Sequence, residues 1–363
     1  MAHITSIGTA NPGNAIAQGK IADFMIKGLG LSKQESQNLR VLYRATGIHS
    51  RYSVIADYAL NGKPYEFYPK TPGLEPFPSI KARMDYFQKS ALDLSIQAID
   101  NCFNGSCDLN ITHLITVSCT GMYAPGLDIE IVTKLGLSPN IERTAINFMG
   151  CYAAFNALKI ANRVVETNTN AKVLIVCVEL CSLHFQKTPD KETALANSLF
   201  SDGAAAVLVQ SESNNEFGLK LNKFHCDIEP KGKKEMTWSI GDFGFEMRLS
   251  DKVPKVIESK IKRLTGSLLN QLNLSIDDIE FFAIHPGGKR ILDVVEEQLE
   301  IPHQKNLHSF KILRDYGNMS SPSVLFVLAS ILKSLKSSDR NKNVLSFAFG
   351  PGLTLESMLL KVV

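Results

Sequence analysis

The feature that most constrains the fold is a set of apolar runs that are too continuous for half-exposed strands. Residues 113–119 and 172–180 are largely β-branched or aliphatic, and residues 344–349 follow a similar pattern. Such runs are typical of strands that are buried on both faces of a sheet. Segments with helical spacing, such as residues 84–103, lie between these runs. The alternation predicts an α/β fold in which helices cover the sheets.

The alternation occurs twice along the chain and divides it into two halves. We expect an N-terminal half over residues 1–211 and a more loosely patterned C-terminal half over residues 212–363. This length is enough for one large domain or for two tightly packed halves. The other predicted strands are residues 3–8, 204–210, 218–228, 279–284 and 354–362, and the other predicted helices are residues 17–28, 33–44, 127–136, 191–200, 253–273, 289–299 and 322–335. The Pro- and Gly-rich stretch 61–80 is predicted to be a surface loop.

Residues 144–166 contain the first candidate for chemistry. A β-leaning run ends at Gly150, Cys151 follows, and small and apolar residues then return at helical spacing. Cys151 is therefore expected near the first turn of a buried helix, where the helix dipole and unpaired N–H groups favour a thiolate. Most cysteines, however, are buried and unreactive. This stretch alone leaves a nucleophile and a core thiol both open.

Two further polar residues lie at glycine-marked junctions. His285 follows an apolar strand and precedes Pro-Gly-Gly, and Asn318 follows Gly317. A histidine at a strand end can hold Cys151 in a thiolate–imidazolium pair, and an asparagine amide can help to stabilise an oxyanion or an enolate. A lone histidine is usually structural, which is our interpretation of His3, His49, His113, His225, His303 and His308.

Composition excludes several classes of protein. The chain has 39 Lys and Arg against 36 Asp and Glu, a net charge of +3 that is too balanced to indicate nucleic-acid binding. Seven cysteines without framework spacing favour a reducing compartment, so we expect the cytoplasm. Cys177 and Cys181 have no matching pair of histidines, and no metal site is expected. No secretory signal or membrane-spanning run is expected either.

Several longer motifs carry a resemblance to a known family. They closely resemble the signatures of the type III polyketide synthases, the chalcone-synthase-like enzymes of the thiolase superfamily. Asn-Met-Ser-Ser together with Phe-Gly-Pro-Gly separates them from the related ketoacyl-carrier-protein synthases. The motifs are Ile7–Pro12, Thr120–Gly126, Gly150–Ala154, Phe200–Ala205, Ile284–Asp293, Tyr316–Ser321 and Phe349–Leu353.

The resemblance implies a fold, an assembly and a reaction. The fold would be the five-layered αβαβα thiolase fold, built from two pseudo-repeated halves, and the chain would form a homodimer. Cys151 would carry the starter acyl group and the growing chain as a thioester. His285 and Asn318 would bind the extender thioester and stabilise the enolate that is left by loss of CO₂. The substrates would be an acyl-CoA starter, or one delivered by an acyl carrier protein, and malonyl-CoA. No metal or other cofactor and no membrane are implied.

The resemblance also assigns residues to the substrate cavity and the coenzyme A tunnel. Phe200 matches a gatekeeper phenylalanine, and Phe245 or Met247 would be the second gatekeeper. The cavity would further include Cys119, Ala124, Cys181, His184 and Ser320. Ala124 lies where the family sends a side chain across the dimer. His184 departs from the small polar residues of plant members and favours a bacterial-type enzyme that makes pyrones or resorcinols. Arg40, Arg44 and Arg51 are candidates for the coenzyme A phosphates, but a solvated helix face explains them equally well.

Three alternatives remain beside this hypothesis. Papain-like hydrolases also have Cys, His and Asn in this order, and His285 lies 134 residues after Cys151, but their Cys-Gly-Ser-Cys-Trp context is missing. A non-catalytic thiolase-fold subunit would not need an intact Cys–His–Asn set. A synthase that performs a single condensation and gives a diketide or β-keto acid differs only in the volume of its cavity.

Overall fold

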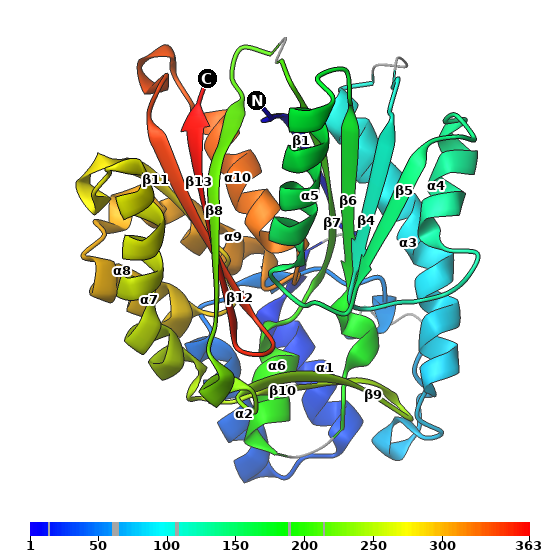
Figure 1. The fold of residues 1–363 in the computed structure, drawn as a ribbon. Coiled ribbons are helices and arrows are strands. Elements are labelled where there is room, and N and C mark those ends of the chain that lie inside the picture. The colour runs from blue at the N-terminus through cyan, green and yellow to red at the C-terminus, as the bar shows by residue number, and fades with distance from the viewer. Residues whose placement is uncertain (14, 60–64, 106–108, 188–189, 213–214) are drawn as a thin grey trace.

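The computed structural model describes residues 1–363 except 14, 60–64, 106–108, 188–189 and 213–214. Within these residues the long strands form one nine-stranded sheet, shown in Figure 1. Its order is β11 (Ile279–Ile284), β12 (Asn343–Gly350), β13 (Thr354–Val362), β8 (Leu219–Ile228), β1 (His3–Ala10), β7 (Asp202–Gln210), β6 (Val173–Leu180), β4 (His113–Ser118) and β5 (Glu142–Asn147).

The sheet consists of two halves with the same pattern of strand directions. In the N-terminal half, β1 pairs antiparallel with β7, β7 antiparallel with β6, and β6 parallel with β4. In the C-terminal half, β8 pairs antiparallel with β13, β13 antiparallel with β12, and β12 parallel with β11. The two half-sheets are joined where β1 pairs with β8, at His3–Lys220 and Ile4–Leu219. This repetition confirms the predicted pseudo-repeat.

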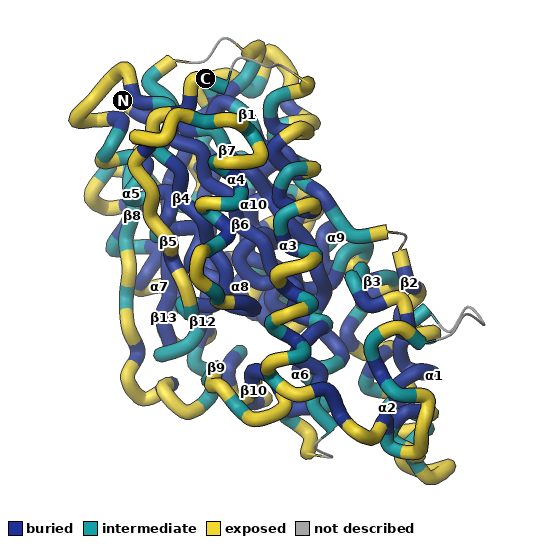
Figure 2. Tube along the Cα trace, turned by 90° about the vertical axis from the view of Figure 1, so that its right-hand side faces the viewer, coloured by how far each residue is buried: buried dark blue, intermediate teal, exposed yellow. Residues whose placement is uncertain are grey.

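Helices fill three layers around the two half-sheets, and Figures 1 and 2 show this arrangement with its buried centre. Helices α5 (Ala153–Thr167) and α10 (Pro322–Ser334) lie between the half-sheets in one apolar cluster. A second cluster joins α3 (Ile80–Phe103) and α4 (Leu127–Leu135) to the outer face of the N-terminal half-sheet and continues below it into α1 (Gln18–Leu29). A third joins α7 (Val253–Leu269) and α8 (Lys289–Leu299) to the C-terminal one. The predicted αβαβα fold is therefore confirmed.

The two central helices differ from the outer ones in their sequence. Most residues of α10 are apolar around the whole helix, and nine of its 13 residues are buried, as expected for a helix between two sheets. The outer helix α8 is amphipathic, and its buried residues occupy one face only. None of the helices in the described residues is long and apolar enough to cross a membrane.

A smaller layer lies below the half-sheets in the view of Figure 1. It contains α1, α2 (Lys33–Ala45), α6 (Lys191–Leu199) and the hairpin of β9 (Met236–Gly241) and β10 (Gly244–Leu249). The short strands β2 (Ile16–Ala17) and β3 (Ser50–Arg51) pair beside it. The sequence did not predict the hairpin, nor α9 (Leu307–Tyr316). Burial along β9 does not alternate from one residue to the next, so the hairpin lacks the usual pattern of a half-exposed strand.

Most predicted elements lie within a few residues of the observed ones. The predicted helix over 84–103 begins earlier, because Ser79 caps it by accepting a hydrogen bond from the N–H of Ala82. Strand β1 continues to Ala10, where a turn was predicted from Thr9. The halves are joined through residues 211–218, so the boundary at 211/212 stays a prediction, and parts of the predicted loops over 61–80 and around Pro189 lie outside the described residues.

Candidate active site

The three candidate residues come from junctions that the fold places at one end of the half-sheets. Cys151 lies between β5 and α5, His285 directly follows β11, and Asn318 lies between α9 and α10. All three side chains are buried. Loops at the ends of strands are where α/β folds usually carry their chemistry.

The turn that carries Cys151 depends on two glycines. Gly150 has φ +82, and a Cβ there would lie 2.6 Å from Cδ of Pro351. A Cβ on Gly350 would collide with the ring of Tyr152. The loop after β12 therefore packs directly on the turn before α5 only because both positions lack a side chain. The Gly150 N–H also donates a hydrogen bond to Sγ of Cys119, at 2.9 Å.

Asn318 is fixed through both its backbone and its side chain. Its N–H donates to the Leu199 carbonyl and its carbonyl accepts from Ser201, both at 2.9 Å. Its side-chain Oδ1 accepts from the Ser320 N–H at 2.8 Å, and Nδ2 donates to the Gly287 carbonyl at 3.3 Å. Because the oxygen is occupied by a backbone donor, the amide orientation is set. Beyond the bond to Gly287, the Asn318 side chain also interacts with the Cys151 thiol.

His285 is held by its backbone and leaves its ring unpaired. Its N–H donates to the Phe347 carbonyl at 2.8 Å, and its carbonyl accepts from Gly287 at the same distance. Neither ring nitrogen has a hydrogen-bond partner within the described part of the chain. The ring packs close to Gly287, where a Cβ would lie 3.3 Å from its Cδ2. Gly287 thus contacts both His285 and Asn318. Buried imidazoles are normally paired, so this ring is available to a substrate.

Burial controls the protonation of the site. It raises the pKa of Cys151 to about 12, although the side chains of Ser320 and Asn318 interact with the thiol and oppose the shift. Burial alone lowers the pKa of His285 to about 3. Both shifts favour the uncharged forms, a thiol at Cys151 and an imidazole at His285. The thiolate–imidazolium pair that we expected from the sequence stays a prediction, and these shifts oppose it in the resting site.

This protonation state predicts how Cys151 reacts with iodoacetamide. Because the thiol pKa is raised, the thiolate fraction at neutral pH is small and should grow about tenfold per pH unit up to at least pH ~9. Peptide mass spectrometry of Cys151 at a series of pH values measures the alkylation rate, with the exposed Cys226 as the internal control. A plateau in the Cys151 rate at about pH 6–7 would instead indicate a preformed ion pair.

A buried carboxylate beside Cys151 was missed from the sequence. Glu179 is the penultimate residue of the apolar strand β6, and burial raises the pKa of its carboxyl. Its Oε2 accepts from the Cys119 N–H at 2.9 Å and from the Thr120 hydroxyl at 2.8 Å. Its Oε1 accepts from the Ser321 hydroxyl at 2.7 Å, at the start of α10. Glu179 therefore joins the two halves next to the nucleophile. The one feature of the sequence that could have indicated this role is the position of Glu179, an acidic residue inside an otherwise apolar run.

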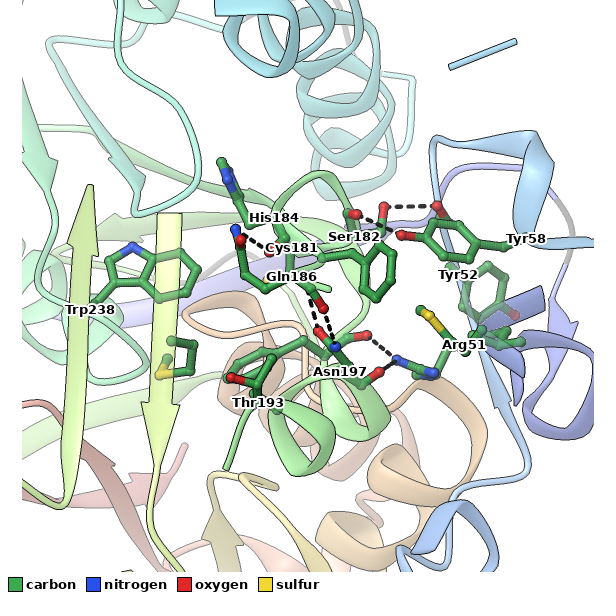
Figure 3. Close-up of a pocket in the computed structure, with 17 residues that line it drawn as sticks. Arg51, Tyr52, Tyr58, Cys181, Ser182, His184, Gln186, Thr193, Asn197 and Trp238 are labelled. Atoms are coloured by element: carbon green, nitrogen blue, oxygen red, sulfur yellow. Dashed lines mark hydrogen bonds between the residues drawn. The ribbon is translucent and has the colours of Figure 1, made fainter. Parts of the chain in front are cut away.

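Several predicted cavity residues line one cavity of about 50 Å³, shown in Figure 3. Phe200, Cys181, His184 and Met247 are among its lining residues. Phe245 is not: its ring is buried and stacks on His184, with centroids 4.3 Å apart and planes at 4°. Of the two candidates for a second gatekeeper, Met247 is the one that faces the cavity.

His184 does not present its polar atoms to this cavity. Nε2 lies 2.7 Å from the Thr120 carbonyl and so must carry the proton, while Nδ1 accepts from the Phe245 N–H at 2.9 Å. Burial lowers the pKa of His184 to about 3, so the ring stays neutral. The sequence analysis treated His184 as a polar group of the cavity, whereas in the structure both of its ring nitrogens are hydrogen-bonded to backbone atoms. Through these two hydrogen bonds the imidazole connects β10 to the loop after β4.

The other predicted residues lie in different surroundings. Ser320 interacts with the Cys151 thiol, and Ala124 is exposed. Arg40 and Arg44 lie on the exposed face of α2, where Arg40 pairs with Asp23 at 2.5 Å. Arg51 is only 4% exposed, so it does not lie on a solvated helix face. It lines the cavity and donates to the carbonyls of Asn197 and Phe200 at 2.8 and 2.7 Å, so a phosphate contact would require an interior site.

Comparisons with known proteins agree with this geometry. The family model described as "Chalcone and stilbene synthases, N-terminal domain" matches residues 1–213, and the corresponding C-terminal model matches residues 220–363. The chain is 30% identical to the "Alpha-pyrone synthesis polyketide synthase-like Pks18" of Mycobacterium tuberculosis, over 100% of this chain and 92% of the relative. It is 31% identical to "Probable polyketide synthase 1" of Dictyostelium discoideum, over 99% of this chain and 11% of that protein.

Solved structures give the same result. The crystal structure of PKS-I from the brown alga Ectocarpus siliculosus superposes with a TM-score of 0.91 at 29% identity, covering 100% of this chain and 98% of that one. The C-terminal type III polyketide synthase domain of Steely1 from Dictyostelium gives 0.90 at 27% identity, with 99% of each chain covered. Sequence motifs, topology and both family models therefore agree, and the chain belongs to the chalcone and stilbene synthase family of type III polyketide synthases.

Proposed function

We propose that the chain loads an acyl starter onto Cys151, extends it by repeated decarboxylative condensation with malonyl-CoA, and cyclises the product to a pyrone or a resorcinol. The observation that carries this proposal is the unpaired, buried imidazole of His285 together with the Asn318 amide, which donates to the Gly287 carbonyl and interacts with the Cys151 thiol. Hydrogen-bond donors next to the thiol in a buried site suit a developing negative charge.

In the loading step, the starter is transferred from its thioester to Cys151. The neutral His285 ring takes the proton of the thiol, and the thiolate attacks the acyl carbonyl. Coenzyme A leaves as a thiolate and takes that proton from the imidazolium. The reaction uses coenzyme A thioesters as substrates, and we propose that it needs no further cofactor.

In the extension step, His285 and Asn318 bind the carbonyl oxygen of malonyl-CoA. Loss of CO₂ leaves its electron pair on the carbon as an enolate, whose oxygen both donors stabilise. The enolate carbon attacks the Cys151 thioester, a carbon–carbon bond forms, and the bond to the Cys151 sulfur breaks. The lengthened chain is then a coenzyme A thioester, and the Cys151 thiolate attacks it, with coenzyme A as the leaving group, before the next round. The buried site excludes water, which strengthens both hydrogen bonds and protects the enolate from protonation.

The family does not decide the product. The name of the Mycobacterium tuberculosis relative refers to α-pyrone synthesis, which supports a pyrone here. A single condensation that ends at a diketide remains the second candidate, because the cavity is small. An acyl carrier protein as starter donor stays a proposal. We also propose a cytoplasmic location, because Cys151 must stay reduced to act as a nucleophile.

Mass spectrometry of products tests the proposed reaction. Purified protein is incubated with malonyl-CoA and a panel of short, long and aromatic acyl-CoA starters. Triketide or tetraketide pyrones or resorcinols whose mass follows the starter are expected. A diketide from every starter would favour the single condensation, and no product with any starter would contradict the proposal for coenzyme A-linked starters.

We propose a homodimer formed at the free edge of the large sheet. The edge strand β5 is exposed at five of its six positions. Met122 and Ile129, which flank the Ala124 loop, are 39% and 41% exposed. An exposed edge strand beside apolar side chains is normally covered by a partner. A two-fold interface there would bring each Ala124 loop toward the other protomer.

Charges placed on this surface should separate the dimer. Wild-type protein is expected to sediment at twice its 40.0 kDa mass, and the double variant Met122→Lys/Ile129→Lys at the monomer mass. Analytical ultracentrifugation measures both. Val41→Lys is the matched control, because Val41 is also an exposed apolar residue, 57% exposed, and lies on α2, away from this edge. A wild-type monomer, or a double variant that stays dimeric, would exclude this interface.

A further inference from the structure

Cys119 directly follows β4, and three segments that are distant from it in the sequence hold it in place. Its N–H donates to Oε2 of Glu179, on β6, at 2.9 Å. Its carbonyl accepts the indole N–H of Trp238, on β9, at 2.8 Å. Its sulfur accepts the N–H of Gly150, the residue before the nucleophile, at 2.9 Å. The N–H, the carbonyl and the sulfur of this buried residue are therefore all engaged.

The Cys119 thiol connects the Glu179 carboxylate to the turn before α5. Burial raises the pKa of this thiol well above its usual range, and the negative charge of Glu179 raises it further. The thiol therefore stays protonated, and it interacts with the Glu179 side chain. Because an ionised carboxylate only accepts hydrogen bonds, the S–H faces Glu179 and the sulfur lone pairs are left for the Gly150 N–H. A protonated thiol is a poor nucleophile, so we do not expect Cys119 to carry an acyl chain.

The bond from Gly150 to Cys119 fixes the backbone that leads into the nucleophile. Gly150 has φ +82, a conformation that L side chains rarely adopt, and its buried N–H needs a partner. The Cys119 sulfur is that partner, so the peptide plane before Gly150 is set. The Cys151 sulfur then interacts with its own backbone N–H and with the side chains of Ser320 and Asn318. The direction of the reactive thiol thus depends on a residue from β4.

We propose that Cys119 is a positioning residue for the nucleophile: its sulfur holds the Gly150 N–H and thereby orients the Cys151 thiol. This inference rests on the proposed function of Cys151. The sequence analysis expected Cys119 in the wall of the substrate cavity, but it is not among the described residues that line the cavity of Figure 3. Cys119 acts through the backbone of the turn and forms no bond to substrate.

Three substitutions at position 119 test the proposal. Cys119→Ala removes the acceptor and should slow acylation of Cys151 by about tenfold or more, because small displacements of a reacting group are costly. Cys119→Val fills the space of the thiol without an acceptor and should be as slow as alanine. Cys119→Ser supplies a hydroxyl that can accept from the N–H and donate to the carboxylate, and should retain about half of the wild-type rate or more. Intact mass after short incubations with hexanoyl-CoA measures these rates.

Two further measurements distinguish a positioning role from a general loss of structure. Release of CO₂ from malonyl-CoA uses His285 and Asn318, so it should stay within about twofold of wild type in the Cys119 variants. Iodoacetamide needs no aligned acyl carbonyl, so alkylation of Cys151 should also change by no more than about twofold. Cys102→Ala is the matched control, because Cys102 is a buried cysteine on α3, outside the site, and this variant should load at the wild-type rate.

The outcomes separate this inference from the function it rests on. If wild-type protein is not acylated at Cys151, the proposed function fails. If folded Cys119→Ala and Cys119→Val load as fast as wild type, the inference is overturned and the function stands. Cys119→Ser as slow as alanine would refute the hydrogen-bond argument. An acyl group on Cys119 itself, found by peptide mass spectrometry, would make it a second carrier. Loss of loading and CO₂ release together, with faster alkylation, would reduce Cys119 to a structural residue and overturn the proposal.

Discussion

Cys151→Ala is expected to abolish polyketide formation, lowering turnover by about 10⁴-fold or more. Without the thiol there is no group to hold the starter, and the enolate has no thioester to attack. The substitution leaves His285 and Asn318 in place, so a slow release of CO₂ from malonyl-CoA should persist. Mass spectrometry of products and a CO₂ assay measure the two activities on the same sample.

The control for this variant is another cysteine outside the site. Cys226 is exposed on β8, and Cys226→Ala should retain both activities. The two assays together also separate the competing explanations. Full-length product from Cys151→Ala would refute the assignment of the nucleophile. Loss of CO₂ release along with condensation would show that the thiol contributes to binding of the malonyl group or that the turn before α5 has collapsed.

The pseudo-repeat of the fold explains why one site contains groups from both halves. Helices α5 and α10 occupy the same central layer, one from each half. Cys151 precedes the first, and Ser320 and Ser321 precede the second. Both helix N-termini therefore carry partial positive charge toward the site. This charge, with the N–H groups of Asn318 and His285, offsets part of the cost of forming a thiolate or enolate in a buried site.

The sequence predicted the parts of the site that depend on local signals. Gly150 and Gly317 occupy backbone positions that other residues would strain, and each stands next to a reactive side chain. The apolar strand before His285 predicted where that side chain emerges. These signals involve neighbours in the chain, so periodicity and turn chemistry reveal them.

The remaining features depend on contacts between distant segments. His184 is fixed by Thr120 and by Phe245, which lies 61 residues away along the chain. Arg51 is buried because it donates a hydrogen bond to the carbonyl of Phe200, just after α6. Oε1 of Glu179 accepts its hydrogen bond from Ser321, which belongs to the other half of the chain. Trp238 belongs to a hairpin with weak alternation. No local pattern carries these pairings, so only the folded chain shows which polar groups are occupied.

His285→Ala is expected to remove loading and extension together, lowering turnover by about 10³-fold or more. The ring is proposed to accept the Cys151 proton in one step and to donate to the enolate oxygen in the other, so both CO₂ release and acylation of Cys151 should fall. His285→Gln separates the roles, because its amide can donate a hydrogen bond but cannot take up a proton at neutral pH.

For His285→Gln we therefore expect CO₂ release from malonyl-CoA to recover by about tenfold over the alanine variant, while acylation of Cys151 stays slow. Intact mass after a short incubation with an acyl-CoA starter measures the acylation rate, and the CO₂ assay measures the other step. Because the resting thiol is neutral, raising the pH should restore acylation in the glutamine variant by supplying hydroxide as the base. Equal loss of both activities in the alanine and glutamine variants, without recovery at high pH, would assign His285 a purely structural part and leave Asn318 as the donor to the enolate.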